Sequence, residues 1–457
     1  MSRSYLLLIF ICNFIFPKDF NIMPILYSQY ESLGRDYSPS QKPVSILGWG
    51  VKGVYQGGPI SIDADFINHT FIGLYNKPNS FSHDQGLAQF IKWPYQDVKS
   101  IYDSRISNMK FIYSGEDINL EFGKFNRNWG PGLSSLTFSN KSPSYPQIGF
   151  NWVINHKLRF EYFIGMLRSL IEDTLSTQYY TNPITTRPVD IKRNVVAHRF
   201  EYDLTPTLTL GGSESIIYAL RDFDFHYFPF IAFWPMKNYI GDIDNMQISI
   251  DIKWQPNNNS LYYTTAFIDE MDPKYIFNKY SENWWGWQFG LQYKDIIIQP
   301  SKIRMEYNWM DHRVYRNKIV LNDYYHYGYP LGFWGGPHSE EFYIDYYFVI
   351  LDTKFIISYS KAKRGELTDQ MLADAYDGIF YERYTGIVEK KQIASMYAIR
   401  EILPNLEMHC GVDIIDWKNA NFEPYGNAII NISDLQTVGK VSLSLGLYYN
   451  YNNNKLR

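Results

Sequence analysis

The sequence predicts an all-β protein, a transmembrane antiparallel β-barrel of about 16 to 18 strands, with short turns on one side and long loops on the other. Three observations lead to this fold class. Apolar and polar residues alternate along segments of about 10 residues, and short polar turns alternate with long connections. Aromatic residues make up 18% of the chain, with 40 Tyr, 30 Phe and 12 Trp in 457 residues.

Alternation with a period of two marks the strands, because successive side chains of a β-strand point to opposite faces of the sheet. In KIRMEYNWM, residues 302–310, the apolar face carries Ile303, Met305 and Tyr307, and charged or amide residues occupy the positions between them. The same alternation occurs at residues 117–124, 157–164, 247–254 and 440–449. Each segment is therefore predicted to be a strand with one apolar and one polar face.

Turn signals divide the chain unevenly. Short polar turns are expected at residues 56–59, 114–116, 155–156, 203–206, 256–259, 352–353 and 404–405. Longer connections run over residues 75–103, 125–145, 167–193, 219–244, 270–283, 312–340 and 362–390. Long loops should outnumber short turns by one if both termini lie on the short-turn side, but the count does not show this excess. Two explanations stay open: a further strand near residues 22–31, or a miscount near residues 414–432.

Soluble β-sandwiches share such alternation, so three features decide in favour of a membrane. Polar strand faces carry charged residues in mid-strand, as a watery lumen tolerates. So many charged strand positions leave too little apolar volume for several soluble cores, whereas closing the sheet in lipid satisfies every edge. Tryptophans also gather near the expected strand ends, where an indole suits a membrane–water boundary. They are Trp49, Trp93, Trp129, Trp152, Trp254, Trp284, Trp285, Trp309 and Trp417.

The N-terminal segment has the pattern of an export signal. Arg3 precedes an apolar stretch over residues 5–16, which is too short to span a bilayer as a helix. The expected organisation is a signal peptide over residues 1–28, an N-terminal extension over 29–43, a single outer-membrane β-barrel over 44–451 and a tail over 452–457.

Composition and motifs exclude several classes of function. The net charge of −4 and the lack of a basic run exclude a nucleic-acid partner. Of the two cysteines, Cys12 lies in the predicted leader, so Cys410 has no partner for a disulfide or a CxxC zinc site. The acidic segment at residues 221–245 lacks the spacing of a calcium loop. No metalloprotease, serine-hydrolase or phosphate-loop motif occurs, so no enzyme, metal or cofactor is predicted.

The segment NWGPGL, residues 128–133, interrupts a strand with a rigid corner. Pro131 and Gly132 fit the two central positions of a type II turn, which with Gly130 would hold Trp129 at the strand end. Two interpretations stay open. The indole is either a platform on which a sugar ring stacks or a side chain that packs a loop into the barrel. In the first interpretation, the residues that would bind sugar hydroxyls are Arg127, Asn128 and Asn140.

A second corner of the same kind follows in FWGGP, residues 333–337. Trp334 is the second candidate platform for a glycan. Gly336 and Pro337 are expected to be structural turn residues, as are the glycines and proline of the first corner.

Three ordered blocks of the chain resemble the Wzi-type capsule-assembly outer-membrane proteins. They are LEFGKFNRNWGPGLSSLTFSN, IDNMQISIDIKWQPNNNSLYYTTAFIDEM and YGYPLGFWGGPHSEEFYIDYYF, between residues 120 and 348. The resemblance implies a lectin-like, non-catalytic barrel in the outer membrane of a Gram-negative bacterium. Such a protein binds or helps assemble capsular polysaccharide or exopolysaccharide at the cell surface. Its other partners would be outer-membrane lipid and the barrel-assembly machinery.

Two further hypotheses stay open. A porin-like diffusion channel would have long loops that constrict a polar lumen, lined by residues such as Arg159, Lys253, Lys302 and Arg304. An outer-membrane hydrolase would need a catalytic pair of carboxylates on either side of a substrate bond.

Overall fold

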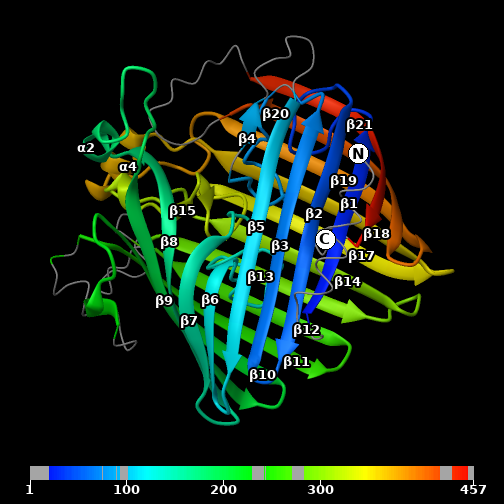
Figure 1. The fold of residues 1–457 in the computed structure, drawn as a ribbon, viewed down its shortest axis with the longest axis horizontal. Coiled ribbons are helices and arrows are strands. Elements are labelled where there is room, and N and C mark those ends of the chain that lie inside the picture. The colour runs from blue at the N-terminus through cyan, green and yellow to red at the C-terminus, as the bar shows by residue number, and fades with distance from the viewer. Residues whose placement is uncertain are drawn as a thin grey trace.

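The computed structural model describes residues 20–74, 76–88, 90–92, 101–228, 241, 243–269, 283–422 and 435–450. These residues form one antiparallel sheet of 19 strands, and 18 of the strands close into a barrel (Figure 1). The barrel strands are β1 (Phe20–Glu31), β2 (Val44–Gly57), β3 (Ile60–Ile72), β5 (Ile101–Ser114), β6 (Ile118–Phe125), β7 (Tyr145–Val153), β8 (Leu158–Glu172), β9 (Asp190–Thr205), β10 (Leu208–Ala219), β11 (Asn245–Asn257), β12 (Ser260–Ile268), β13 (Trp285–Lys294), β14 (Ser301–Met310), β17 (Ser339–Ile350), β18 (Thr353–Gly365), β19 (Val388–Leu403), β20 (Leu406–Ala420) and β21 (Gln436–Tyr449). The remaining strand, β4 (Phe90–Lys92), is added to the edge of β5.

The first and last strands close the barrel. Along β1, Leu26 lies opposite Trp49 of β2 on one edge and opposite Tyr449 of β21 on the other. This strand answers the question that the turn count left open, because a strand does occupy residues 22–31. With β1 included, long loops outnumber short turns, and both ends of the wall lie on the short-turn side (Figure 1).

The wall begins earlier in the chain than the sequence indicated. It starts at Phe20 instead of residue 44, so part of the expected leader and of the expected extension lies in β1. The sequence indicated that residues 20–28 end a leader, because they follow an apolar segment without an intervening turn. Residues 1–19 and 451–457 lie outside the described part of the chain.

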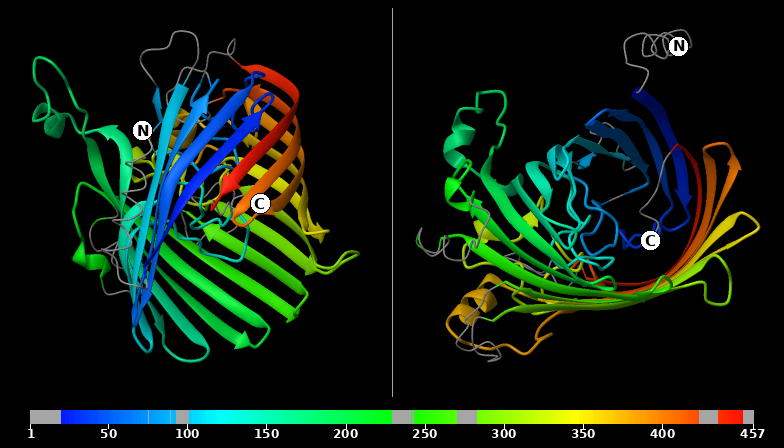
Figure 2. Two further views of the ribbon diagram at one scale, coloured as in Figure 1. Left: turned by 45° about the vertical axis from the view of Figure 1, so that its right-hand side comes forward. Right: turned by 90° about the horizontal axis from the view of Figure 1, so that it is seen from below.

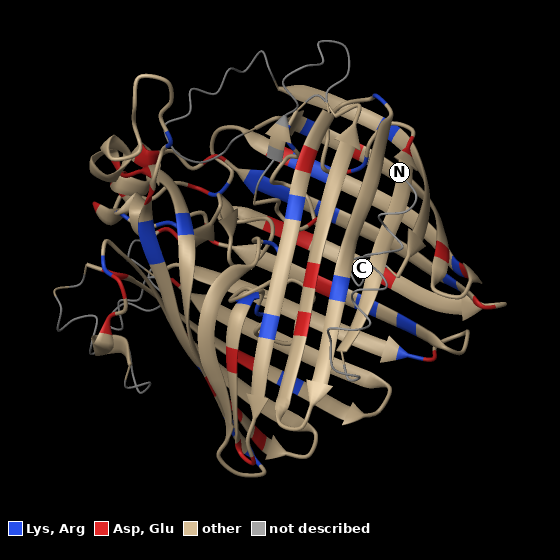
Figure 3. Ribbon diagram, in the orientation of Figure 1, with Lys and Arg blue, Asp and Glu red and all other residues tan. Residues whose placement is uncertain are grey.

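The two faces of the wall have opposite polarity. On β21, Val441, Leu443 and Leu445 point outward with exposed fractions of 52%, 59% and 53%, whereas Lys440 and Ser442 point inward and are buried. Charged residues occur in the middle of many strands (Figure 3). An apolar outer face on a wall whose inner face carries many polar and charged residues is the reverse of a soluble sandwich and is the arrangement that surrounding lipid requires.

The tryptophans divide into two groups. Trp49 and Trp254 lie on the outer face with exposed fractions of 54% and 47%, as expected for rings at a membrane boundary. Trp129, Trp284 and Trp417 are buried, at 4%, 0% and 0%. The expectation that all of them belong to an outer girdle is therefore wrong for the buried three, and Trp93 lies outside the described residues.

Short elements occur in the long loops. They are α2 (Thr174–Gln178), α4 (Asp369–Tyr376), the 3-10 turns η1 (Phe225–Tyr227) and η3 (Val320–Asn322), and the hairpin of β15 (Tyr325–His326) with β16 (Tyr329–Pro330). In the described part of the chain, none of the helices has the length and apolar character needed to span a bilayer.

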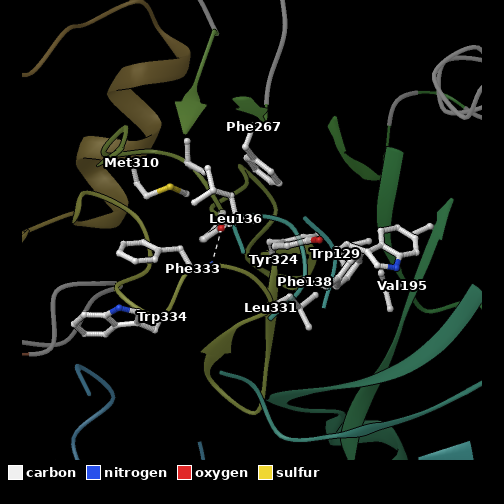
Figure 4. Close-up of a cluster of buried hydrophobic side chains, with 14 of the residues drawn as sticks. Trp129, Leu136, Phe138, Val195, Phe267, Met310, Tyr324, Leu331, Phe333 and Trp334 are labelled. Carbon is white, nitrogen blue, oxygen red and sulfur yellow. Dashed lines mark hydrogen bonds between the residues drawn. The ribbon is translucent and has the colours of Figure 1, made fainter. Parts of the chain in front are cut away.

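Two long loops fold into the bore and supply most of the loop residues of an inner core, to which the loops after β3 and β18 add Phe81, Leu367 and Leu372 (Figures 2 and 4). The loop after β6 contributes Trp129, Leu136 and Phe138, and the loop after β14 contributes Val314, Tyr315, Tyr324, Leu331, Phe333 and Trp334. The wall supplies inward-facing side chains, among them Phe163, Val195, Ile217 and Phe267. The inner core is thus built from segments far apart in the sequence.

The polarity of the wall makes a testable prediction. Leu443→Arg on β21 should destabilise the folded barrel by about 2–4 kcal/mol, because it places a charge on the outer face away from either rim. The measurement is equilibrium unfolding in urea in the presence of lipid vesicles. Thr437→Arg, at the loop end of the same strand, is the control and should cost at most about 1 kcal/mol. Equal costs at the two positions would contradict a lipid-facing surface.

Candidate functional site

The Trp-Gly-Pro-Gly corner turns the chain into the bore. Beyond it, the Leu133 N–H donates to Glu306 Oε2 at 2.7 Å, and Gln288 Nε2 donates to the Ser134 carbonyl at 2.8 Å. Glu306 lies on β14 and Gln288 on β13, so the loop that leaves β6 reaches other strands of the wall. These bonds satisfy polar groups that the loop carries into the interior.

The corner differs in detail from the type II turn that the sequence predicted. Its left-handed residue is Gly130, with φ of +114°, and not Gly132. Gly132 leaves room for a side chain instead, since a Cβ there would lie 2.0 Å from Gln288 Oε1 and would displace that amide. One glycine therefore supplies a backbone conformation and the other supplies space.

Trp129 is a structural residue of the inner core. Its side chain is 4% exposed, and its ring meets Phe138 and Phe163 edge to face, with centroids 5.1 and 5.3 Å apart. The indole N–H donates to Glu161 Oε2 at 2.8 Å. A sugar cannot stack on a ring in this position, so the packing interpretation agrees with the structure and the platform interpretation does not.

Arg127 is also buried, at 6% exposure. Its Nη2 donates to Glu121 at 3.0 Å, its Nε donates to Gln147 at 2.5 Å, and its guanidinium carbon lies 4.4 Å from the centre of the Phe163 ring. Through these contacts the guanidinium group pairs with residues of the barrel wall. Asn128 and Asn140, the other two predicted sugar ligands of this loop, are exposed.

Trp334 repeats the behaviour of Trp129. It is 2% exposed, its indole N–H donates to Glu341 Oε2 at 2.7 Å, and the ring of His83 lies 4.2 Å away. The turn after it matches the sequence prediction, because Gly336 has φ of +73° and its N–H donates to the Phe333 carbonyl at 3.0 Å. Pro337 follows directly and begins the next turn.

Buried lysines tie the loops to the wall and to one another. Lys391 of β19 donates to the Asp36 carbonyl at 2.6 Å, and Lys440 of β21 donates to the Ser38 carbonyl at 2.7 Å. Lys141, from the loop after β6, donates to the Ser82 and Asp84 carbonyls at 2.6 and 2.8 Å. Around these contacts the bore retains a cavity of about 140 Å³ beside Lys141 and a polar cavity of about 70 Å³ beside Asp36.

His338 joins two loops as a neutral ring. Its Nδ1–H donates to the Glu366 carbonyl at 2.8 Å, and its Nε2 accepts the Tyr384 N–H at 2.7 Å. Protonation at Nε2 would remove that acceptor. Burial lowers the pKa of His338 to about 4, and the bond from the ring to the Glu366 carbonyl opposes this shift only in part.

An exposed aromatic pair that the sequence did not single out lies on the loop between β8 and β9. Tyr179 and Tyr180 follow α2 and are 89% and 59% exposed. Asp173 caps the helix by accepting the Ser176 N–H at 3.0 Å, and Thr181 and Thr186 form a bridge that closes the loop. The signal in the sequence is QYYTN, in which two tyrosines stand between amide and hydroxyl side chains.

Comparisons with known proteins identify the fold. Neither models of protein families nor curated protein sequences match this chain. Among solved structures, the chain is similar to Wzi of Escherichia coli, an outer-membrane protein involved in group 1 capsule assembly and a carbohydrate-binding β-barrel. The TM-score is 0.56 at 11% identity, over 99% of this chain and 89% of that chain.

Other outer-membrane barrels are also similar. OccAB3 of Acinetobacter baumannii has a TM-score of 0.44 at 13% identity, over 95% of this chain and 99% of that chain. OprD of Pseudomonas aeruginosa has a TM-score of 0.45 at 11% identity, over 95% of each chain. Similarity at these identities shows an outer-membrane β-barrel fold and no more.

Close contact between the two inward loops makes a second prediction. A Cβ at Gly332 would lie 2.1 Å from the Leu136 carbonyl oxygen and 2.2 Å from the Tyr315 hydroxyl. Gly332→Ala should therefore push the loops apart and destabilise the inner core by about 1–3 kcal/mol. Thermal unfolding, with limited proteolysis of both loops, measures this effect. Gly439→Ala is the control, because nothing lies within 4 Å of a Cβ there. Identical behaviour of the two variants would refute the contact.

A third prediction concerns pH. The pKa of His338 is about 4 in the folded protein and 6.5 for an unperturbed histidine. Between these values the unfolded loop binds a proton that the folded loop excludes, so the contact loses stability as the pH falls from 6.5 to 4. Hydrogen exchange at the Tyr384 amide, corrected for the intrinsic rate, should show this loss of protection.

The control for the pH prediction is His338→Gln. Its side chain does not titrate, so protection at Tyr384 should vary much less with pH in this variant. The same pH dependence in both proteins would assign the effect to another group.

Proposed function

We propose that the protein is a Wzi-type, non-catalytic barrel in the outer membrane of a Gram-negative bacterium. Its role is to bind or help anchor capsular polysaccharide or exopolysaccharide at the cell surface. Like other barrels of this membrane, it would be inserted by the barrel-assembly machinery.

The observation that carries the proposal is the packed inner core. A diffusion channel needs a continuous water path, whereas the bore of this barrel contains Tyr315, Tyr324, Phe333 and Trp334 at exposures of 2% or less. The burial of these side chains favours a barrel that serves as a rigid base for its surface loops over a barrel that conducts solutes. The carbohydrate-binding described for the similar Wzi structure agrees with this interpretation.

The proposed contact surface is the loop of Tyr179 and Tyr180. A tyrosine ring offers an apolar face to a pyranose and a hydroxyl to its substituents. Gln178 and Asn182, beside the pair, supply further hydrogen-bonding groups. Single contacts of this kind are weak, and a repeating polymer would reach useful affinity by engaging many barrels at once.

A diffusion channel is the second candidate, because charged groups line the bore near the short turns. Arg159 donates to Asp203 at 2.6 Å, and Arg304 pairs with Asp345. Planar-bilayer recordings separate the two functions. We expect almost no conductance from the polysaccharide-binding barrel, and stable ohmic channels would favour the second candidate.

The fourth prediction tests the tyrosine pair. Tyr179→Ala with Tyr180→Ala should weaken binding of the purified barrel to polysaccharide from its own strain about tenfold, since each lost ring contact is worth about 0.5–1.5 kcal/mol. Biolayer interferometry with the immobilised polymer measures this loss. Ile184→Ala is the control, because Ile184 is 94% exposed on the same loop and carries no ring. If the intact barrel does not bind the polymer, the proposed function fails. If both variants bind like wild type, the proposed surface fails.

A further inference from the structure

A groove lies on the outer face of the barrel at the loop end of β7, β8 and β9. Its volume is about 590 Å³. The residues that give it its chemical character are Ile148, Ile164, Met166, Arg168, Lys192 and Phe223. These six residues lie outside the inner core and outside the loop of Tyr179 and Tyr180, while Leu167 of the inner core and Pro188 and Val189 of that loop complete the lining.

The groove exists because neighbouring strands end at different heights. The last pair between β7 and β8 joins Gln147 to Gly165, but β8 continues to Glu172. The exposed backbone of this extension is covered by the β15–β16 hairpin. The Arg168 N–H donates to His326 Nδ1 at 2.9 Å, and the Tyr327 N–H donates to the Arg168 carbonyl at 3.3 Å. The step in the wall is thus closed toward the bore and open toward the outside.

The floor of the groove is part of the lipid-facing surface. Ile148 and Ile164 are opposite each other in the register of β7 and β8, and Met166 follows on the same outward parity. Ile148 and Met166 are 60% and 62% exposed. An acyl chain that covers the barrel wall can therefore continue into the groove without leaving apolar surface.

Two cationic side chains lie next to this floor, toward the loop end of the strands. Arg168 and Lys192 are opposite each other in the register of β8 and β9. The Arg168 Nε atom pairs with Asp190 at 2.7 Å, and Lys192 pairs with Asp222 at 3.2 Å. The Lys192 and Asp222 side chains are 76% and 84% exposed, so their ion pair is weak and an incoming anion can replace it.

An aromatic cluster forms the rim. Phe223, Phe225 and Phe228 are 41%, 74% and 50% exposed and contact one another, with the nearest pair of ring centroids 4.8 Å apart. The buried Tyr227 holds this segment against the outer face, and Tyr162 Oη donates to its carbonyl at 3.2 Å. Exposed rings beside an apolar wall mark the level of a membrane–water interface.

We infer that the groove binds a phosphorylated, acylated glycolipid of the outer leaflet. One acyl chain lies on Ile148 and Met166, and a phosphate group on the sugar takes hydrogen bonds from Arg168 and Lys192. The guanidinium offers five donors and uses its Nε for Asp190, so it can hold a phosphate through its other nitrogens. The rings of the rim would lie among the head groups.

The test uses the detergent-purified full-length barrel and bisphosphorylated lipid A as the probe, with binding followed by native mass spectrometry. Arg168→Gln with Lys192→Gln should weaken binding about thirtyfold, because each basic side chain beside an anionic lipid contributes about fivefold to the affinity. Lys294→Gln with Lys302→Gln is the matched control. Those lysines are also opposite each other in register, but they lie at the short-turn end on β13 and β14. The control removes the same charge and should bind like wild type.

A second arm changes the lipid instead of the protein. Lipid A without phosphates should bind wild type as weakly as bisphosphorylated lipid A binds the Arg168→Gln, Lys192→Gln variant. Phosphatidylglycerol, an acylated phosphate without a sugar, should also bind more weakly than bisphosphorylated lipid A. Equal binding of the two phosphorylated lipids, or equal binding by wild type and variant, would overturn the assignment. The comparison of the two phosphorylated lipids stands even if the variant folds poorly, because it uses only the wild-type barrel.

Discussion

The structure depends on one constraint: peptide N–H and C=O groups surrounded by hydrocarbon must find partners within the protein. The sheet meets this constraint by closing, with β1 hydrogen-bonded to β2 along its length and to β21 from Leu26 onward. Once the ring is closed, residues of one parity face lipid and residues of the other face the bore. Most charged side chains in the middle of the strands then face the bore, and they pair there, as Arg199 does with Asp251 at 2.7 Å.

The same constraint acts again inside the bore. The inward loops bring carbonyl groups away from bulk water, and the wall supplies cations to satisfy them. Lys440 is surrounded by the carbonyls of Leu33, Arg35, Ser38 and Ser40 at 2.7–3.1 Å. A buried ammonium group is expensive unless it has several such partners, and a buried carbonyl is expensive without a donor. The wall lysine therefore satisfies the buried loop carbonyls, and those carbonyls in turn satisfy the buried ammonium group.

The wall could be predicted from the sequence because alternation is a local property. Segments such as residues 302–310 show by themselves which side chains share a face. In a closed barrel, one of the two faces contacts lipid and the other faces the bore. The strand β1 was harder, because its residues follow an apolar segment and no turn separates the two. The roles of Trp129 and Trp334 depend on Glu161, Phe163 and His83, which lie far away in the chain. A tryptophan at a strand end fits an outer girdle and an inner core equally well, so only the tertiary contacts decide.

The hairpin of β15 and β16 connects the interior with the outer surface. Its inner side carries Tyr324, Leu331 and neighbouring residues into the core, while His326 and Tyr327 bond to the edge that β8 extends beyond β7. If the hairpin were absent, β8 would expose unpaired backbone toward a gap in the wall, which lipid does not tolerate. The same hairpin therefore fills part of the bore and closes the step in the wall. A barrel that packs its interior in this way can end neighbouring strands at unequal heights, and the unequal heights create the outer groove.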